Sequence, residues 1–397
     1  MLQVLEPQPP DALLGVMAAY AADSDPTKLD LGVGVYRDAS GITPVMAAVK
    51  SAEQRLLAAQ QSKGYVGAGG NRPFAAFIEA LTLGESHPAR VAGRVVTLQT
   101  PGGCGALRLA ADLIQRSQRG ARVAISDPSW PNHVPLIGGA GLAVDYYPYY
   151  EAGSGTLAVD SMLTALERLA SGSVVLVQAA CHNPTGADLD AGAWEQLAAV
   201  CERRSLLPLI DLAYQGLGSG LDGDAQALRR LTARLPEALI AVSCSKNFGL
   251  YRERVGALIA IAADSRGAGI VMSHLQALAR RMWSMPPDHG AAIVATIAAD
   301  AGLKAEWLAE LEGMRVRIAA LRRQLADALK REFGDGRYDY VGSQRGMFSL
   351  LGVDAEAVRQ LKDREHVYVA PDSRINIAGL PDPQIARVAA AIRRVVR

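Results

Sequence analysis

The sequence predicts an α/β fold, with a large domain built on a mostly parallel sheet flanked by helices, plus a smaller α+β domain. Three observations support this prediction. Short runs rich in β-branched residues alternate with helical patterns through the middle of the 397-residue chain, as in proteins built from βαβ units. These runs contain few polar residues, which is typical of strands buried on both faces. One long amphipathic stretch then precedes a C-terminal region of mixed pattern.

Six apolar runs are the expected strands of the sheet. They cover residues 95–99, 122–126, 173–178, 206–211, 239–245 and 255–261. Stretches of helical pattern lie between them, such as GALRLAADLIQRSQ and AGAWEQLAAVCERR. A helix between two strands carries the chain back to the end of the sheet where the first strand began. The next strand then runs in the same direction, so this order predicts mostly parallel neighbours.

The expected division into domains follows from the same pattern. Residues 44–300 contain all six expected strands and form the expected large domain. Residues 302–332 are predicted to form one long amphipathic helix that leads to a smaller α+β region over 333–397. The first forty residues carry few strand signals. We therefore expect residues 1–43 to pack with residues 301–397 as a discontinuous small domain.

Composition argues against several classes of function. Lysine and arginine together number 41, against 40 aspartate and glutamate residues, so no nucleic-acid or anionic membrane partner is expected. No apolar run is long enough to cross a membrane, and the N-terminal residues lack the pattern of a signal peptide. Four scattered cysteines without a CxxC pair favour reduced thiols in the cytoplasm and no metal site.

Residues capable of chemistry follow the first five expected strands. TPGGCGALR follows residues 95–99, DPSWPNH follows 122–126, and AACHNPTG follows 173–178. The fourth strand ends in DLAY and the fifth in SKN. Each segment alone could be an ordinary turn, because Gly, Pro, Asn and Asp are common in loops. Since ligands of such sheets bind at the carboxyl ends of the strands, five segments in register predict a ligand site there.

The first of these segments is a candidate phosphate cradle. Two glycines at the start of a helical pattern let backbone N–H groups approach an anion, and the helix N-terminus favours negative charge. Hydroxyl groups and a guanidinium from a later segment could complete the grip on a phosphate ester. The candidate residues are Gly102, Gly103, Cys104, Ser243, Ser245 and Arg254. The alternative for the glycines is a plain turn from strand to helix.

A second set of residues suits a flat heteroaromatic ring. Asp211 ends an apolar strand, where a carboxylate is costly unless paired, so it could pair with a cationic ring nitrogen or cap the next helix. Tyr214 and Asn183 could donate to a phenolic oxygen, although HNPTG is also a turn sequence. Trp130 could stack on the ring or be partly buried in the ordinary way. His133 could orient Asp211 or be a structural histidine.

A lysine lies among these groups, in the segment SCSKNFGLYRERVGA of residues 243–257. A phosphate, a ring nitrogen, a phenolic oxygen and a stacking surface together describe pyridoxal 5′-phosphate. Lys246 would hold this cofactor as a Schiff base and later carry a proton. Pyridoxal 5′-phosphate is therefore the expected cofactor, and no metal ion is expected.

With these segments in place, the chain resembles the class I aminotransferases, the group that contains the aspartate and aromatic amino-acid aminotransferases. The resemblance covers nearly the whole chain and rests on segments that follow the order of the family. They are LGVGVYRDASGITPV, TPGGCGALR, DPSWPNH, CHNPTGADL, DLAYQG, SKNFGLYRERVG, SMPPDHG, QRGMFS and RINIAG. The resemblance implies the fold type I architecture of pyridoxal-phosphate-dependent transferases, and a homodimer with shared active sites.

The resemblance also implies roles for individual residues. The catalytic residues would be Lys246, Asp211 and Tyr214. The cofactor would be bound by Tyr65 of the neighbouring subunit and by Gly103, Cys104, Trp130, Asn183, Asp211, Tyr214, Ser243, Ser245, Lys246 and Arg254. The substrate would be bound by Gly34, Trp130, Asn183, Arg280 and Arg374. Arg374 would clamp the α-carboxylate, and Arg280 would meet a distal carboxylate across the dimer interface.

The expected reaction transfers the amino group of phenylalanine or tyrosine, and with lower activity aspartate, to 2-oxoglutarate with ping-pong kinetics. This chain departs from the strict aspartate pattern of the family at three positions. Gly64 and Met285 stand where asparagine is usual, and Cys104 where threonine is usual. These changes make the site less polar or roomier, and methionine contacts aromatic rings favourably.

Two other activities remain as alternatives. The first is an aspartate aminotransferase in which the three departures are neutral. The second, less favoured, is a lyase or decarboxylase that uses the same cofactor. Arg280 and Arg374 argue against that second activity, because two arginines suit recognition of two carboxylates, which transamination with 2-oxoglutarate requires.

Overall fold

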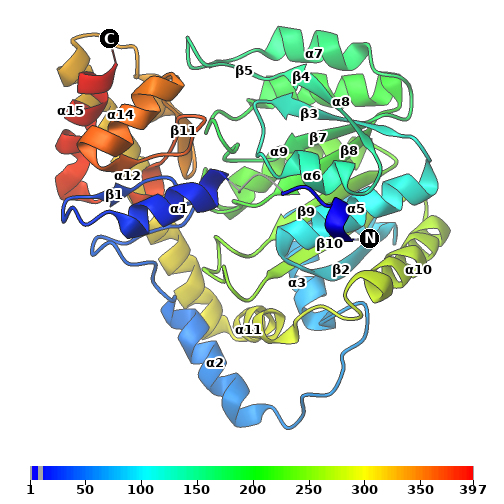
Figure 1. Cartoon of the computed structure of the whole chain (residues 1–397). Helices are drawn as coiled ribbons and strands as arrows, with labels where there is room; N and C mark the ends of the chain where they lie inside the picture. Colours follow the sequence, from blue (N-terminus) through cyan, green and yellow to red (C-terminus); the bar gives the residue numbers. More distant parts are fainter. Residues whose placement is uncertain (1, 8–11, 397) are drawn as a thin grey trace.

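The structure is a computed structural model that describes residues 2–7 and 12–396. Its centre is a seven-stranded sheet in the order β2-β10-β9-β8-β7-β3-β4 (Figure 1). All strands except β10 run in one direction, and β10 is antiparallel to both of its neighbours. The strands are β2 (Val95–Pro101), β3 (Arg122–Asp127), β4 (Ala143–Pro148), β7 (Val174–Gln178), β8 (Leu207–Leu212), β9 (Ala238–Ser243) and β10 (Val255–Ile261). The expected α/β fold with a mostly parallel sheet is confirmed.

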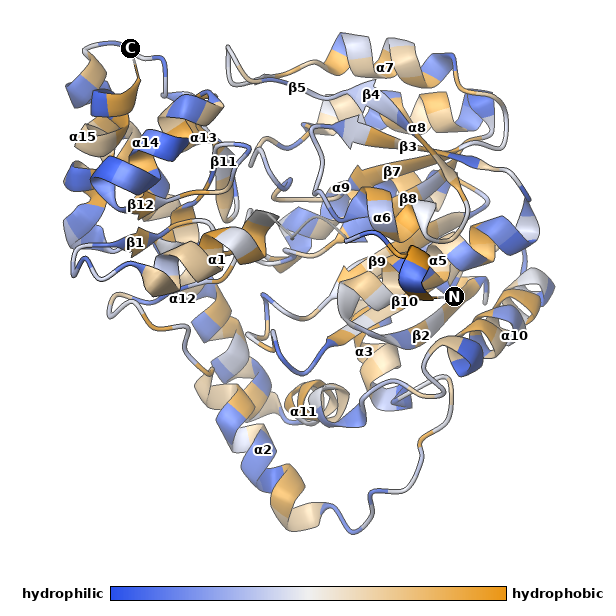
Figure 2. Cartoon of the chain, viewed as in Figure 1, coloured by the Kyte–Doolittle hydropathy of each residue, from blue (hydrophilic) through white to orange (hydrophobic). Residues whose placement is uncertain are grey.

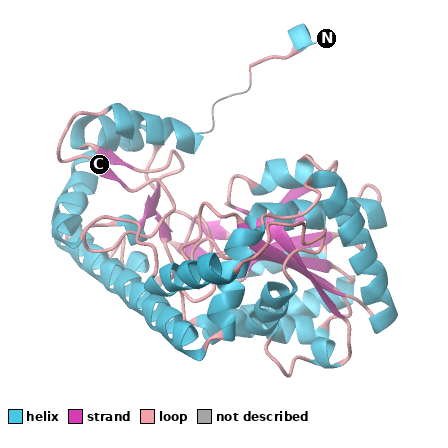
Figure 3. Ribbon diagram, turned by 90° about the horizontal axis from the view of Figure 1, so that it is seen from below, coloured by secondary structure: helices cyan, strands magenta, loops and turns pink. Residues whose placement is uncertain are grey.

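Helices cover both faces of this sheet, which lies between two helical layers in Figure 3. The core on one face includes α5 (Gly102–Ser117), α6 (His133–Gly138) and α10 (Ser265–Met282). The larger core on the other face includes α2 (Ala47–Ala59), α3 (Arg72–Leu83), α7 (Val159–Glu167), α8 (Ala191–Arg204), α9 (Leu221–Arg234) and α11 (Asp288–Ala299). Because both faces are buried, the inner strands are continuous apolar runs, coloured orange in Figure 2.

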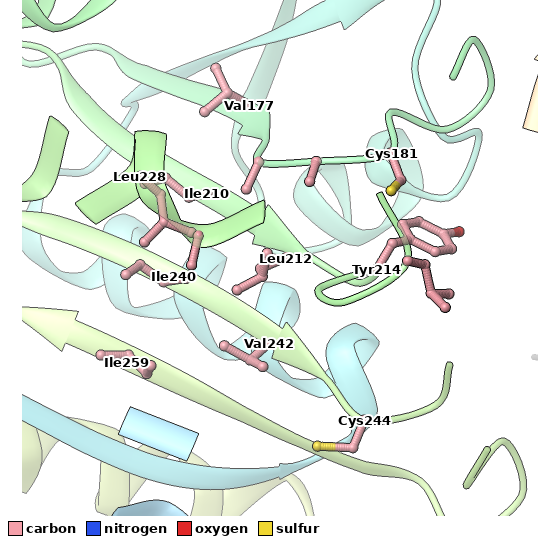
Figure 4. Packing of buried hydrophobic residues seen from close by; sticks show 14 of the residues in the cluster. Val177, Cys181, Ile210, Leu212, Tyr214, Leu228, Ile240, Val242, Cys244 and Ile259 are labelled. Carbon is pink, nitrogen blue, oxygen red and sulfur yellow. The ribbon is translucent and has the colours of Figure 1, made fainter. Parts of the chain in front are cut away.

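Successive residues of the inner strands point to opposite faces of the sheet. Ile210 and Ile240 belong to the larger core, whereas Leu209 and Leu239 belong to the core on the other face. Figure 4 shows Ile210 and Ile240 on neighbouring strands, with Tyr214 just beyond the end of β8. The loops that follow the strands are therefore held by a frame packed on both sides.

The observed strands begin and end within two residues of the expected bounds, and the strand over 255–261 has those bounds unchanged. β4 is the strand of this sheet that the apolar runs do not predict. It lies at the edge, pairs only with β3, and its sequence AVDYYP mixes polar and apolar residues. Among its six residues only Tyr147 is buried, so β4 does not need the continuous apolar run of the inner strands.

The long helix α12 (Ala301–Phe333) begins and ends one residue outside the expected range 302–332. Its first half packs in the larger core through Leu303 and Trp307, and its second half enters a separate core through Leu321 and Leu325. That separate core also contains residues of α13 (Tyr340–Ser343), α14 (Ala355–Glu365), β12 (Val367–Tyr368), β13 (Arg374–Asn376) and α15 (Ile385–Val395). α12 therefore joins the central sheet region to a second packed unit.

The N-terminal residues lie against this second unit. β1 (Leu29–Asp30) pairs in parallel with β12, and the backbone N–H of Arg37 donates to the carbonyl of Ala378 at 3.0 Å. These contacts favour a discontinuous small domain, and the proposed bounds of 1–43 with 301–397 and of 44–300 stay a prediction.

The remaining elements are short or flank the units described above. They are η1 (Leu2–Val4), α1 (Ala12–Ala22), α4 (Pro88–Val91), β5 (Tyr150–Glu151), β6 (Thr156–Leu157), β11 (Phe348–Leu350), η2 (Ile377–Gly379) and η3 (Asp382–Gln384). β11 pairs with β13, and β5 pairs with β6. No helix among residues 2–7 and 12–396 is long and apolar enough to cross a membrane.

Candidate active site

A cavity of about 300 Å³ lies at the carboxyl ends of the parallel strands. Its walls come from the start of α5, from the segments after β3, β7, β8 and β9, and from the N- and C-terminal regions of the chain. All of the predicted cofactor and substrate residues line it except Gly102, Tyr65 and Arg280. These lining residues are Gly34, Gly103, Cys104, Trp130, Asn183, Asp211, Tyr214, Ser243, Ser245, Lys246, Arg254 and Arg374.

One end of the cavity is built to receive an anion. α5 begins at Gly102, whose φ of +69° favours glycine, and a Cβ there would lie 2.7 Å from Nη2 of Arg254. Nη1 of Arg254 donates to Oγ of Ser245 at 3.4 Å, and Oγ of Ser243 lies 3.2 Å from the same oxygen. A helix N-terminus, a guanidinium and two hydroxyls thus meet around Gly103, as a phosphate site requires.

The Asp211 carboxylate is held by a buried histidine. Asp211 lies in β8 opposite Gln178 of β7, and its Oδ2 lies 3.0 Å from Nε2 of His133. Nδ1 of His133 lies 2.8 Å from Oγ of Ser129. Because Ser129 can accept or donate at Nδ1, His133 can present an N–H to Asp211. This hydrogen bond fixes the orientation of the carboxylate, and it is compatible with the predicted orienting role of His133.

Asn183 links two groups on different parts of the chain. Its Nδ2 donates to Oη of Tyr214 at 3.3 Å, and its Oδ1 accepts from Nη1 of Arg374 at 2.9 Å. Asn183 follows β7, whereas Arg374 begins β13 in the second packed unit. Burial raises the pKa of Tyr214 well above its ordinary range, so its hydroxyl is protonated and can donate a hydrogen bond.

Arg374 is buried, and one of its donors lacks a partner. Nη2 donates to the carbonyl of Gly32 at 2.9 Å, and the guanidinium lies 4.3 Å from the centre of the Phe348 ring. Nε makes no hydrogen bond among the residues that the structure describes. Burial lowers the pKa of Arg374, although an arginine remains charged at neutral pH. A buried cation with an unused donor beside a cavity suits a carboxylate ligand.

Lys246 lines the cavity and is half-buried. Its Nζ lies 4.8 Å from the centre of the Tyr214 ring. Burial lowers the pKa of Lys246, the charge of Asp211 opposes that change, and the charges of Arg254 and Arg374 lower the pKa further. A lysine whose pKa is lowered is neutral at lower pH than usual, so it can act as a nucleophile or a base.

Trp130 and Gly34 line other parts of the cavity. The ring of Trp130 meets the ring of His133 edge-on, with 5.2 Å between the centroids. A Cβ at Gly34 would lie 2.8 Å from the Phe348 ring, so a side chain at that position would displace a wall of the cavity. The absence of a side chain leaves the backbone of Gly34 open to a ligand, as the predicted substrate contact requires.

Tyr65 and Arg280 do not line this cavity. They face a separate surface hollow together with Met285. Tyr65 is 93% exposed, and the guanidinium of Arg280 donates to Oγ of Ser284. Of the three residues predicted to set specificity, Cys104 therefore lines the cavity, Met285 lies in the hollow, and Gly64 is exposed.

Several residues that line the cavity are not predicted from the sequence, and Gln178 is the most informative of them. Its Nε2 donates to the carbonyl of Asn183 at 2.9 Å, and its Oε1 accepts from the N–H of Asn183 at 2.8 Å. This two-way bridge fixes the residue that links Tyr214 and Arg374. A signal exists in the sequence, because Gln178 is a polar residue at the end of an apolar run, as Asp211 is. Tyr251 and Phe348 also line the cavity, but no local pattern marks them.

Comparison with known proteins identifies the class to which this fold and site belong. Residues 26–392 match the aminotransferase class I and II family, and the chain belongs to that family. It is 49% identical to the aromatic-amino-acid aminotransferase of Pseudomonas aeruginosa, over 98% of this chain and 97% of that protein. It is 40% identical to the aspartate aminotransferase of Escherichia coli over the full length of both.

Solved structures agree with these sequence comparisons. An aromatic-amino-acid aminotransferase from Burkholderia pseudomallei, covalently bound to pyridoxal phosphate, superposes with a TM-score of 0.97 at 40% identity, over 100% of both chains. The cytoplasmic aspartate aminotransferase of Saccharomyces cerevisiae superposes with a TM-score of 0.96 at 32% identity, over 100% of this chain and 98% of that one. The chain is thus an aminotransferase with the expected architecture.

Proposed function

We propose that the cavity binds pyridoxal 5′-phosphate on Lys246 and transfers amino groups from aromatic amino acids to 2-oxoglutarate. The observation that carries this proposal is the convergence of four chemically distinct groups on one cavity. They are an anion site at the start of α5, a buried carboxylate at Asp211, a phenol at Tyr214 and a lysine with a lowered pKa. A phosphorylated pyridine aldehyde would use all four.

The residues present fit this cofactor. Gly102 leaves open the space beside Arg254 that a Cβ would fill, where the phosphate would be held. Asp211 would pair with the pyridine nitrogen, and Tyr214 with Asn183 would donate to the phenolic oxygen. When bound, the cofactor supplies an electron sink for the carbanion that forms when Cα loses its proton. Asp211 supports that chemistry because its negative charge keeps a neighbouring ring nitrogen protonated.

The protein groups would bind and orient the amino acid. Arg374 would grip the α-carboxylate through its unused Nε and its terminal nitrogens, because a guanidinium matches a carboxylate in shape and charge. This grip would fix the Cα–H bond relative to Nζ of Lys246. Once free of its covalent bond, Nζ would take the proton from Cα and deliver it during the transfer. Its lowered pKa supports that role, since a base must be neutral.

An aromatic substrate is the preferred choice for this chain. Relatives at 49% and 44% identity are named aromatic-amino-acid aminotransferases, and Cys104 gives the cavity a less polar wall than a threonine would. Phe348 and Tyr251 also line the cavity. Aspartate is the second candidate substrate, favoured by Arg280, whose guanidinium could hold a second carboxylate, and by relatives named aspartate aminotransferases.

A homodimer would complete the site. Tyr65 and Arg280 share a surface hollow away from the cavity, and Tyr65 is almost fully exposed. Large apolar residues nearby in sequence are also exposed, among them Leu57 at 87%, which favours a surface covered by a second copy of the chain. Tyr65 would then reach the phosphate, and Arg280 the distal carboxylate, of the neighbouring site.

A cytoplasmic location is also proposed, supported by four free cysteines.

The experiment that tests the substrate compares two half-reactions of the cofactor-loaded protein. Loss of the absorbance band of the bound cofactor is followed after mixing with L-phenylalanine and, separately, with L-aspartate. A higher kcat/KM for phenylalanine supports the aromatic assignment, a higher value for aspartate replaces it, and no change with either amino acid refutes transamination. The double variant Gly64→Asn with Met285→Asn should move the preference toward aspartate. An unchanged preference would remove these two positions from the account.

A further inference from the structure

The segment that carries Lys246 has little regular backbone structure. Residues 244–254 connect β9 to β10 without a helix or a strand, and Lys246 lies near the start of this segment. Within this segment, the N–H of Gly249 donates to the carbonyl of Lys246 at a long 3.3 Å. The backbone beside the lysine therefore lacks the ladder of hydrogen bonds that holds the neighbouring strands. Its position must come from contacts with other parts of the chain.

Trp307 of α12 provides such a contact. It is fully buried, and its Nε1 donates to the carbonyl of Asn247 at 2.7 Å. Its ring lies parallel to that of Phe248, with 4.4 Å between the centroids and 4° between the planes. Phe77 meets both rings edge-on. One side chain thus grips the two residues that follow Lys246, one through a hydrogen bond and one through stacking.

A buried indole usually finds some acceptor, so the hydrogen bond alone could serve only stability. Two further observations distinguish this case. Throughout residues 2–7 and 12–396, the bond from Trp307 is the only hydrogen bond from another element to the backbone of residues 246–248. In addition, Oδ1 of Asn247 is buried and has no hydrogen-bond partner in the part of the chain that the structure describes. The side-chain oxygen of Asn247 therefore does not hold the segment in place.

We propose that Trp307 is a positioning residue for Lys246, and this inference rests on the proposed function. Nζ must reach both the cofactor and Cα of the substrate, and small displacements of a reacting group reduce rates steeply. Without the indole hydrogen bond, the 246–248 backbone can shift and Nζ gains access to water. The same helix continues into the unit that carries Arg374, so Trp307 also connects the lysine with the substrate-binding arginine.

The test uses the cofactor-loaded protein and matched substitutions. Trp307→Phe keeps an aromatic ring beside Phe248 but removes the N–H donor. Trp194→Phe is the control, because Trp194 is also buried in the core but does not line the cavity. The pH at which the absorbance of the bound cofactor changes is measured for each protein, together with kcat and KM for phenylalanine and the thermal midpoint Tm.

Both substitutions are expected to lower Tm, but Trp307→Phe alone should alter the site. Its spectral midpoint should rise by about half a pH unit, because water around Nζ favours the protonated form. Its kcat should fall about tenfold while KM changes less than about twofold, because Nζ is misplaced and substrate binding is not. A Trp307→Phe protein with a lower Tm but an unchanged midpoint and kcat overturns the proposal.

A second variant covers the case in which Trp307→Phe does not fold. Phe248→Leu removes the stacking surface and leaves the indole N–H in place. It should raise the spectral midpoint in the same direction, and an unchanged midpoint would count against positioning by this contact. If the unsubstituted protein shows no cofactor absorbance, the proposed function itself fails. That result is distinct from a failure of the Trp307 inference.

Discussion

Arg374→Lys isolates the grip on the substrate carboxylate. Lysine keeps the positive charge but loses the planar fork and the unused Nε donor. A hydrogen bond to a charged group contributes about 1.5–3 kcal/mol. Arg374 is also held in place by Asn183, by the carbonyl of Gly32 and by the Phe348 ring. A lysine cannot make all three contacts at once, so its ammonium group is held less firmly. Its charge is then poorly placed for the substrate carboxylate, which weakens the remaining interaction.

The expected loss for phenylalanine is about 2–4 kcal/mol of transition-state stabilisation, or about 30- to 1000-fold in kcat/KM. The assay follows the absorbance of the bound cofactor in a rapid-mixing half-reaction. 2-Phenylethylamine is the control substrate, because it has the aromatic ring and the amine but no carboxylate. Its slow reaction should change less than about threefold.

A second control separates the site from general effects of the substitution. Arg337 is an exposed arginine that pairs with Asp335, so Arg337→Lys should change kcat/KM by less than about twofold. Two results would refute the account of Arg374. One is a loss below about threefold with phenylalanine, and the other is an equal loss with phenylalanine and 2-phenylethylamine.

Three further predictions concern the cofactor and the dimer. Asp211→Asn should still bind the cofactor but react with phenylalanine at least about 100-fold more slowly, because an amide cannot keep the ring nitrogen protonated; a loss below tenfold in the half-reaction would contradict this role. In the cofactor-free protein, the lowered pKa of Lys246 means that the unfolded chain binds more protons between that pKa and 10.5. The free-energy cost of burying Lys246 therefore falls as pH rises. Near neutral pH, Lys246→Met should be more stable to unfolding than the unsubstituted chain. This difference in stability should disappear towards pH 10.5. Urea unfolding at several pH values measures this difference, and a difference independent of pH would be inconsistent with a lowered pKa. Mixing a Tyr65→Ala chain with a Lys246→Ala chain should restore part of the activity, because one site of the mixed dimer then has both residues, and no recovery in verified mixed dimers would exclude shared sites.

Much of the fold can be predicted from the sequence because the inner strands are buried on both faces. That environment requires continuous apolar runs, and it also makes Asp211 conspicuous at the end of one of them. β4 is not predicted because only one of its six residues is buried, so it tolerates polar residues. The direction of β10 could not be predicted either, since a buried apolar run has the same composition in a parallel or an antiparallel pair.

Some residues of the candidate site can be placed from their neighbours in the sequence, whereas others depend on contacts between distant parts of the chain. Gly103 and Cys104 follow a strand and start a helix, so their place can be deduced from neighbouring residues. The pairing of Asn183 with Arg374 joins residues 191 positions apart, and no local pattern encodes such a contact. Trp307 is similar, because its role depends on α12 crossing the segment after Lys246, which follows only from the packed structure.

The central claim is that Lys246 holds the cofactor in this cavity. Treating the cofactor-loaded protein with sodium borohydride fixes the cofactor to the amine that carries it, and mass spectrometry of the peptides then locates the modification. We expect a phosphopyridoxyl group on Lys246 and loss of this modification in Lys246→Ala. A modification on another lysine, or none on the reduced protein, would contradict it.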